Sequence, residues 1–156
     1  MLTPHQYEAV GRLVLTFNEI EYAFEVYSAH LLGAPEWSVS VLLAEEGTFR
    51  HKVERFDGIL QAIGNEHPSF HTQIEPIRQW VRKAKELATK RNEYVHALVV
   101  HDFQTNEARL RIRGTDTVCN EAEINFLATE AAVLVDQLSK HCGDLHVMIE
   151  EARGSK

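Results

Sequence analysis

The sequence contains only two cysteines, Cys119 and Cys142, which is too few for a disulfide framework. The N-terminal residues also lack the basic segment followed by an apolar segment that marks a signal peptide. We therefore expect an intracellular, cytoplasmic protein. In it the two thiols are expected to fill the apolar core, because neither has an evident base partner in the sequence.

Long apolar runs are absent as well: none approaches the roughly 18 residues needed to cross a membrane, so we expect no membrane contact. Positive charge is scarce, because 16 Lys and Arg stand against 23 Asp and Glu, a formal net charge of −7. Such a chain creates no overall positive field, and any contact with nucleic acid must be local. Internal repeats and glycine-rich phosphate loops are also missing.

The 156 residues, 44% of them apolar, suit one globular domain, which we place at residues 1–152 with a tail at 153–156. Apolar residues at spacings of three and four predict its helices. The first three are expected over 4–32, 37–45 and 49–63. Gly33 followed by Pro35 is a stop signal for the first helix, and Thr48 can cap the third.

A fourth helix is predicted from about Ser69 to about His96 or Leu98, with Pro76 marking either a kink or the true first turn. The period then changes to two, which predicts a β-hairpin over 97–114 and a third short segment over 115–119. In the second strand, Leu110 and Ile112 are expected to face the core and the arginines on either side of them to face outward.

Asn120 followed by Glu123 is a plausible capping pair for a last helix over 121–152. The predicted fold class is therefore all-α. It is an antiparallel bundle of four main helices plus a short one, with a small β-hairpin inserted before the last helix.

The stretch "RNEYVH" at the end of the fourth helix is the strongest functional candidate. Asn92 and His96 are four residues apart and share a helix face, and the long side chain of Arg91 can lean over from about 100° away. The three polar groups can thus converge near a helix C-terminus, whose partial negative charge favours a protonated His96. The alternative on this local pattern is a polar helix end capped by a histidine.

This group suits phosphoryl chemistry. The guanidinium of Arg91 matches phosphate oxygens, His96 can exchange a proton near neutral pH, and Asn92 can orient the imidazole or the substrate. In RNA the 2′-hydroxyl supplies the nucleophile, so a base, an acid and charge stabilisation suffice without a metal. One histidine does not easily serve as both base and acid, which favours a symmetric homodimer.

The sequence resembles the HEPN superfamily of small helical domains, marked by an Arg, four to six intervening residues and a His. "RNEYVH" fits the four-residue version with Asn, and "FNEIEYAFEVYSAHLLG" and "FRHKVERFDGIL" are similar to the segments found earlier in such proteins. The resemblance spans most of residues 10–100. It implies a metal-independent endoribonuclease that acts as a homodimer with Arg91, Asn92 and His96 at its cleft.

Many members of that superfamily are toxins of toxin–antitoxin pairs or act in phage defence, so the resemblance also implies RNA as substrate and an antitoxin protein as a partner. Other members are inactive and serve as RNA- or protein-binding modules, and the acidity of this chain keeps that alternative open. A third hypothesis is that the protein binds nucleotides and assists a neighbouring nucleotidyltransferase.

Further residues have both a functional and a structural interpretation. Arg109, Arg111 and Arg113 are either a phosphate track beside the cleft or an exposed strand face protected against edge pairing. Glu21 can reach Arg91 or Lys52 and support the site from behind, or it belongs to a solvated face.

Histidines are frequent in the chain, but their spacing does not build a metal site. His67 and His71 have a workable ligand spacing, yet Pro68 lies between them and no Cys or carboxylate motif completes a set. We therefore expect no metal and no cofactor.

Overall fold

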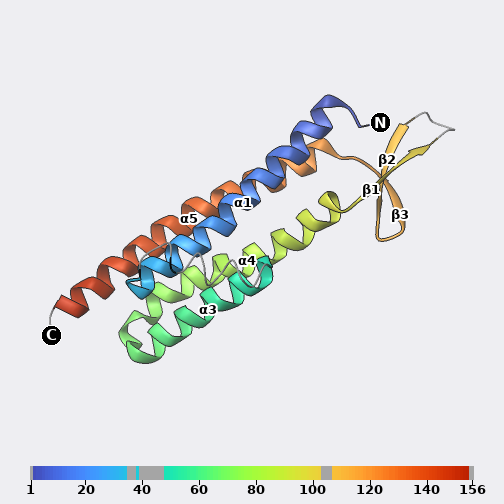
Figure 1. Ribbon diagram of the computed structural model, residues 1–156. Coiled ribbons are helices and arrows are strands. Elements are labelled where there is room, and N and C mark those ends of the chain that lie inside the picture. Colours follow the sequence, from blue (N-terminus) through green and yellow to red (C-terminus); the bar gives the residue numbers. More distant parts are fainter. Residues whose placement is uncertain (1, 35–37, 39–47, 103–106, 155–156) are drawn as a thin grey trace. The chain divides into compact units, whose positions relative to one another are not determined.

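The computed structural model describes residues 2–34, 38, 48–102 and 107–154 (Figure 1). Four long helices and a small antiparallel sheet before the last helix confirm the predicted all-α class with a β insertion. The predicted short helix over 37–45 lies outside the described residues, apart from Ser38. In chain order the elements are α1 (Pro4–Leu32), α3 (Phe49–Glu66), the 3-10 helix η1 (Pro68–Phe70), α4 (His71–Val95), β1 (Leu98–Asp102), β2 (Glu107–Ile112), β3 (Thr115–Val118) and α5 (Glu121–Gly154).

The helix ends follow from the local signals in the sequence. After α1, the N–H groups of Gly33 and Ala34 donate to the carbonyls of His30 and Ala29, and Gly33 has the left-handed φ of 63° that this C-cap requires. The Thr48 hydroxyl accepts from the backbone N–H of His51 at the start of α3.

The other two long helices have equally definite starts. The side-chain oxygen of Asn120 accepts from the backbone N–H of Glu123 at 3.2 Å and caps α5, as predicted. Helix α4 begins at His71, after η1, so Pro76 lies inside the helix and not in its first turn. None of the helices in the described part of the chain has an apolar stretch long enough to cross a membrane.

The chain divides into two units that are described separately. Unit 1 comprises Met1–Asn18 and Glu86–Ala132, and unit 2 comprises Glu19–Lys85 and Val133–Lys156. Helices α1, α4 and α5 therefore contribute residues to both units.

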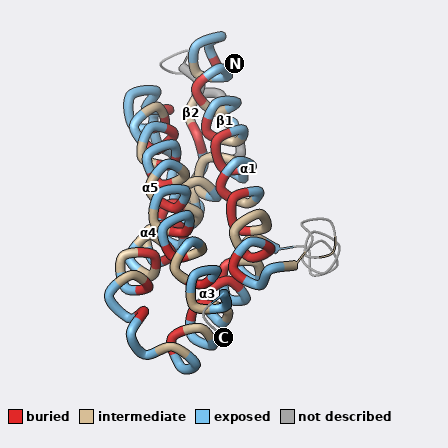
Figure 2. Tube along the Cα trace, turned by 90° about the vertical axis from the view of Figure 1, so that its left-hand side faces the viewer, coloured by how far each residue is buried: buried red, intermediate tan, exposed pale blue. Residues whose placement is uncertain are grey.

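Unit 1 packs the first half of α1, the end of α4 and the start of α5 around a small apolar core, next to the sheet. Figure 2 shows buried positions recurring along α1 and α5. The side-chain amide of Gln6 donates to the carbonyl of Cys119 at 3.2 Å and joins α1 to the segment that precedes α5. The buried apolar residues of this unit include Leu13, Phe17, Leu87, Leu110, Cys119, Ile124 and Leu127.

The sheet has the order β1-β2-β3, and both pairings are antiparallel. It confirms the predicted hairpin together with its third segment. Arg113 (φ 49°) and Gly114 (φ 85°) form the two-residue turn between β2 and β3, in which both residues need a left-handed backbone. Leu110 is buried as expected, and Arg111 and Arg113 are exposed, with Arg113 in the turn. Arg109 is half-buried, so the prediction that it faces outward holds only in part.

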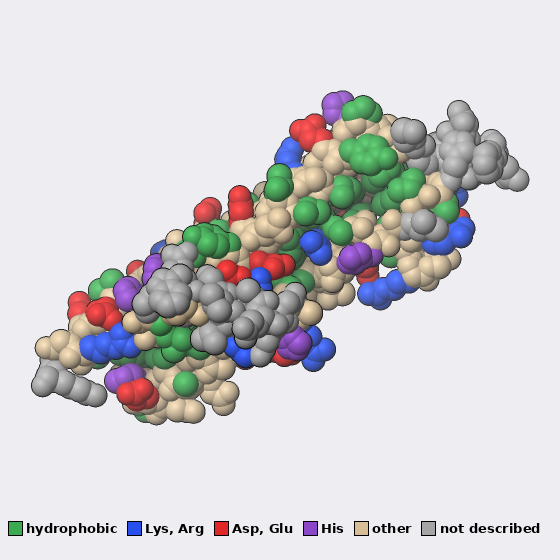
Figure 3. Space-filling view, viewed as in Figure 1, with side chains coloured by type: hydrophobic (Ala, Val, Ile, Leu, Met, Phe, Trp, Pro, Cys, Tyr) green, Lys and Arg blue, Asp and Glu red, His purple; other side chains and the backbone are tan. Residues whose placement is uncertain are grey.

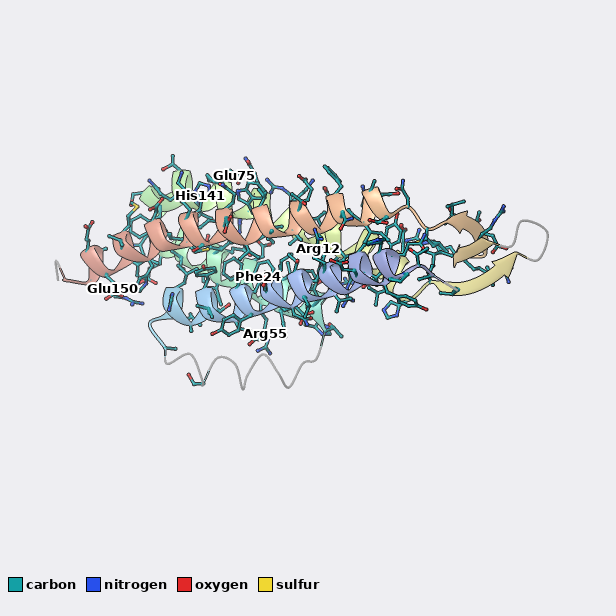
Figure 4. All side chains as sticks on the ribbon, turned by 90° about the horizontal axis from the view of Figure 1, so that it is seen from above. Arg12, Phe24, Arg55, Glu75, His141 and Glu150 are labelled. Carbon is teal, nitrogen blue, oxygen red and sulfur yellow. The ribbon has the colours of Figure 1, made fainter. Side chains whose placement is uncertain are left out.

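Unit 2 is a helical bundle built from α3, η1, the second half of α1, most of α4 and the second half of α5. At its centre Phe24 is fully buried and contacts Phe49 and Phe56, with ring centroids 6.1 and 5.1 Å away (Figure 4). An ion pair between Arg78 and Asp57, 3.3 Å apart, joins α4 to α3 at the edge of this core.

Candidate functional site

The candidate site lies where α4 ends and β1 begins. The backbone N–H of His96 still donates to the carbonyl of Asn92 at 3.1 Å, and that of Ala97 reaches back to Tyr94 at 3.4 Å. The chain then becomes extended, because the β-branched residues that follow pair with β2. His96 is thereby presented as an exposed residue directly after the last helical turn.

Arg91 is held on two sides by its own unit. Its Nη1 donates to the Oδ1 of Asn92 at 2.9 Å, and its guanidinium carbon lies 5.8 Å from the centroid of the Phe17 ring. Its Nε is buried and has no hydrogen-bond partner among the described residues. Arg91 is therefore a partly desolvated cation that is fixed by an amide and by an aromatic ring.

Asn92 and His96, at the end of α4, line an open groove with a volume of about 250 Å³. Arg111 and Ile112 of β2 and Arg113 of the turn line the same groove, so it combines residues from the helix end and from the sheet. Lys, Arg and His side chains are visible on this part of the surface (Figure 3). The other described lining residues are Glu93 and Ala97.

The structure thus brings together four of the residues proposed from the sequence: Asn92, His96, Arg111 and Arg113. Arg91 is not among the described residues that line the groove, but its hydrogen bond to Asn92 connects it to the groove wall. Arg109 is likewise absent from the described lining and lies half-buried in β2.

Both arginines of the groove have acidic partners, which the sequence reasoning did not identify. Arg111 binds Asp116 with two hydrogen bonds, of 2.7 and 3.0 Å, and Arg113 lies 2.9 Å from Glu93. The hydrogen bond and the charge of Asp116 raise the pKa of Arg111, and the same hydrogen bond lowers the pKa of Asp116. The sequence did contain a signal for Asp116. With a two-residue turn at Arg113 and Gly114, antiparallel pairing of the two strands places Asp116 opposite Arg111.

Tyr94 is a third residue that the sequence reasoning missed. Burial and a hydrogen bond with Glu123 raise the pKa of its hydroxyl well above the ordinary value of 10.0. This contact connects α4 to the first turn of α5, on a different side of the helix end from the groove-lining Asn92 and His96. Its effect is to fix the helix end that carries the site.

Glu21 reaches Lys52, one of the two partners considered for it, and both belong to unit 2. The Nζ of Lys52 lies 3.0 Å from Glu21 and 2.8 Å from Glu25. Burial lowers the pKa of Lys52, but the bonds to the two carboxylates outweigh burial and raise it overall. The cluster joins α1 to α3, and its role as support for the site stays a prediction.

His67, His71 and the two cysteines have structural surroundings. His67 stacks on Phe70 with centroids 5.0 Å apart, and His71 lies against Gly64. Among the described residues, no three His, Cys, Asp or Glu side chains form a group that could hold a metal ion. Both cysteines are buried and free, and burial raises the pKa of Cys142 to about 12.

Comparisons with known proteins give no assignment for this arrangement. No family model matches the chain, and neither a curated protein nor a solved structure matches it significantly. The residues of the site itself are therefore the basis on which a function can be proposed.

Proposed function

We propose that this protein is a metal-independent endoribonuclease of the HEPN type that acts as a homodimer, in the role of a toxin or a phage-defence effector. The observation that carries the proposal is the groove that Asn92 and His96 line together with Arg111 and Arg113. An exposed imidazole beside guanidinium groups is a combination suited to a phosphodiester.

In the proposed reaction, a His96 imidazole removes the proton from a ribose 2′-hydroxyl, and the 2′-oxygen attacks the adjacent phosphorus. The bond from phosphorus to the 5′-oxygen breaks, and that oxygen takes a proton from a second, protonated His96. The products are a 2′,3′-cyclic phosphate and a free 5′-hydroxyl. Arg91 stabilises the charge that develops on the phosphoryl oxygens, and Asn92 keeps Arg91 in place.

We propose a homodimer because the base and the acid of this reaction are two different His96 side chains. The described part of the chain has a single histidine, His96, among the residues that line the groove. The reaction needs a base and an acid in the same cycle, and a second copy of the chain is the simplest source of the second imidazole. An antitoxin protein would be the natural inhibitor of such an enzyme.

A second candidate function is a catalytically inactive HEPN-like dimer that binds RNA or a protein partner. A specific observation favours it: Arg111 and Arg113 already pair with Asp116 and Glu93, so phosphate must compete with carboxylates for both arginines. The net charge of −7 acts in the same direction.

Incubation of the purified protein with single-stranded RNA in EDTA distinguishes the two functions. We expect the wild-type protein to cleave the RNA, and Arg91→Ala or His96→Ala to lower the rate by roughly a hundredfold or more. Lys90→Ala and His5→Ala are the controls, because each removes an exposed basic side chain of unit 1 that is not among the described residues lining the groove. Circular dichroism checks that every variant keeps the helical fold.

Cleavage that requires a divalent metal contradicts the proposed mechanism. RNA binding without cleavage, equal in the wild type and in His96→Ala, favours the inactive binding module instead.

A further inference from the structure

We propose that Phe17 of α1 is a positioning residue of the ribonuclease site and that it acts through Arg91. The proposal rests on the proposed function and adds a residue, 74 positions away from Arg91 in the sequence, that no motif assigns to the site. In this proposal Phe17 does not touch the substrate. Its ring determines where the guanidinium of Arg91 lies.

The contacts of Arg91 define this role. The guanidinium carbon lies 5.8 Å from the Phe17 ring centroid, within the range of a cation–π interaction. The side-chain oxygen Oδ1 of Asn92 accepts from Nη1 at 2.9 Å and fixes the guanidinium from one edge. Nε is buried, and no described residue accepts a hydrogen bond from it, so the ring is the group that compensates this loss of hydration.

The geometry preserves the chemistry that a phosphate needs. An aromatic ring covers one face of a guanidinium, whereas the N–H groups point outward in its plane. A cation held in this way keeps in-plane donors for phosphoryl oxygens and loses less conformational entropy when substrate binds.

Phe17 is suited to act as a rigid support. Only 2% of its surface is exposed, so the ring is held in place by packing in the core. A flexible or exposed ring would move with the arginine and would not determine its direction. Leucine at this position keeps an apolar side chain but removes the π face that attracts the cation.

The test compares Phe17→Leu with Phe24→Leu in steady-state cleavage of single-stranded RNA. Phe24 is the matched control, because it is an equally buried phenylalanine on the same helix and belongs to unit 2. We expect Phe17→Leu to lower kcat roughly tenfold with little change in KM, since Arg91 acts on the transition state. Phe24→Leu is expected to leave kcat unchanged at a temperature where both variants are folded.

A double-mutant cycle with Arg91→Ala separates positioning from a general effect on the fold. If Phe17 acts through Arg91, Phe17→Leu has no further effect on the residual rate of Arg91→Ala. Additive losses, or an equal loss in Phe24→Leu, overturn the proposal.

An NMR measurement gives a readout that does not depend on activity. The Nε–Hε resonance of Arg91 is expected at an upfield-shifted position caused by the ring current of Phe17, and to lose that shift in Phe17→Leu but not in Phe24→Leu. Cleavage by the wild type without this shift overturns the role of Phe17 alone. A wild-type protein that shows the shift but does not cleave RNA overturns the proposed function, and the positioning role fails with it.

Discussion

Asn92 and Glu93 are adjacent residues with opposite effects on the candidate groove. The Asn92 amide accepts from Arg91 and leaves the cation charged and oriented. The Glu93 carboxylate pairs with Arg113 at 2.9 Å and places a negative charge in a groove proposed to receive phosphate. Since Glu93 is only 32% exposed, its charge is screened less than that of a fully solvated carboxylate.

Glu93→Gln is therefore expected to tighten RNA binding. Removal of the carboxylate frees Arg113 and ends the repulsion of phosphate, so the affinity should rise roughly two- to fivefold, and more at low salt. The measurement is fluorescence anisotropy with labelled single-stranded RNA, in the His96→Ala background so that nothing is cleaved.

Glu86→Gln is the control for this experiment, because Glu86 is an exposed carboxylate on the same helix within unit 1. A decrease in affinity in Glu93→Gln would show that the ion pair builds the groove and that its loss outweighs the removed repulsion.

At the scale of elements, the turn after β2 determines whether Arg113 reaches the groove. Gly114 has φ 85°, which an alanine adopts only with strain. The turn directly follows β2, which carries the groove residues Arg111 and Ile112, so a distorted turn displaces the Arg113 side chain without deleting it.

Gly114→Ala is expected to destabilise the protein by about 1 kcal/mol and to weaken RNA binding as much as Arg113→Ala does. Gly11→Ala is the matched control: Gly11 lies in α1 with open space around it, so alanine there should be neutral or stabilising by about 0.5–1 kcal/mol. Urea unfolding measures both variants. Full affinity in Gly114→Ala would exclude the turn as a determinant of the groove.

The ion cluster between α1 and α3 is expected to make the stability of the protein depend on pH. The pKa of Lys52 is raised above 10.5 in the folded state, so its contribution to stability is complete below pH 10.5 and is lost as the pH rises through the folded pKa. Lys52→Met leaves Glu21 and Glu25 without their cation and should cost about 2 kcal/mol at neutral pH.

The difference in unfolding free energy between the wild type and Lys52→Met should therefore be constant from pH 7 to about pH 10 and shrink above it. Urea unfolding at each pH checks this. Lys90→Met is the control for the loss of an exposed lysine. A difference that grows with pH would mean that the cluster does not depend on protonated Lys52.

The sequence predicted the helices and strands better than it predicted contacts between individual residues. The spacing of apolar residues together with Gly33, Thr48 and Asn120 predicted the helix bounds within a few residues, because these signals are local. The change of period after Val95 predicted the strands for the same reason. The contacts of Phe17 with Arg91 and of Glu93 with Arg113 were not predictable, because each joins segments far apart in the sequence whose distance only packing determines.

At the scale of the whole molecule, the proposed reaction depends on two copies of the chain. If both His96 side chains of a dimer act in one cleft, a dimer with one His96→Ala subunit is inactive. The activity of a mixed population then depends on the fraction of dimers in which both subunits are wild type.

Mixing wild type with His96→Ala in increasing proportions, with subunit exchange allowed to reach equilibrium, measures this dependence. We expect activity to fall with the square of the wild-type fraction, to roughly a quarter at equal amounts. Independent sites would retain roughly half, as would a monomer. A mixture of wild type with Lys90→Ala should show no loss. Analytical ultracentrifugation at the assay concentration tests separately whether the protein is a dimer. If it is a dimer and the activity falls linearly with the wild-type fraction, the shared cleft is contradicted but the dimer is not.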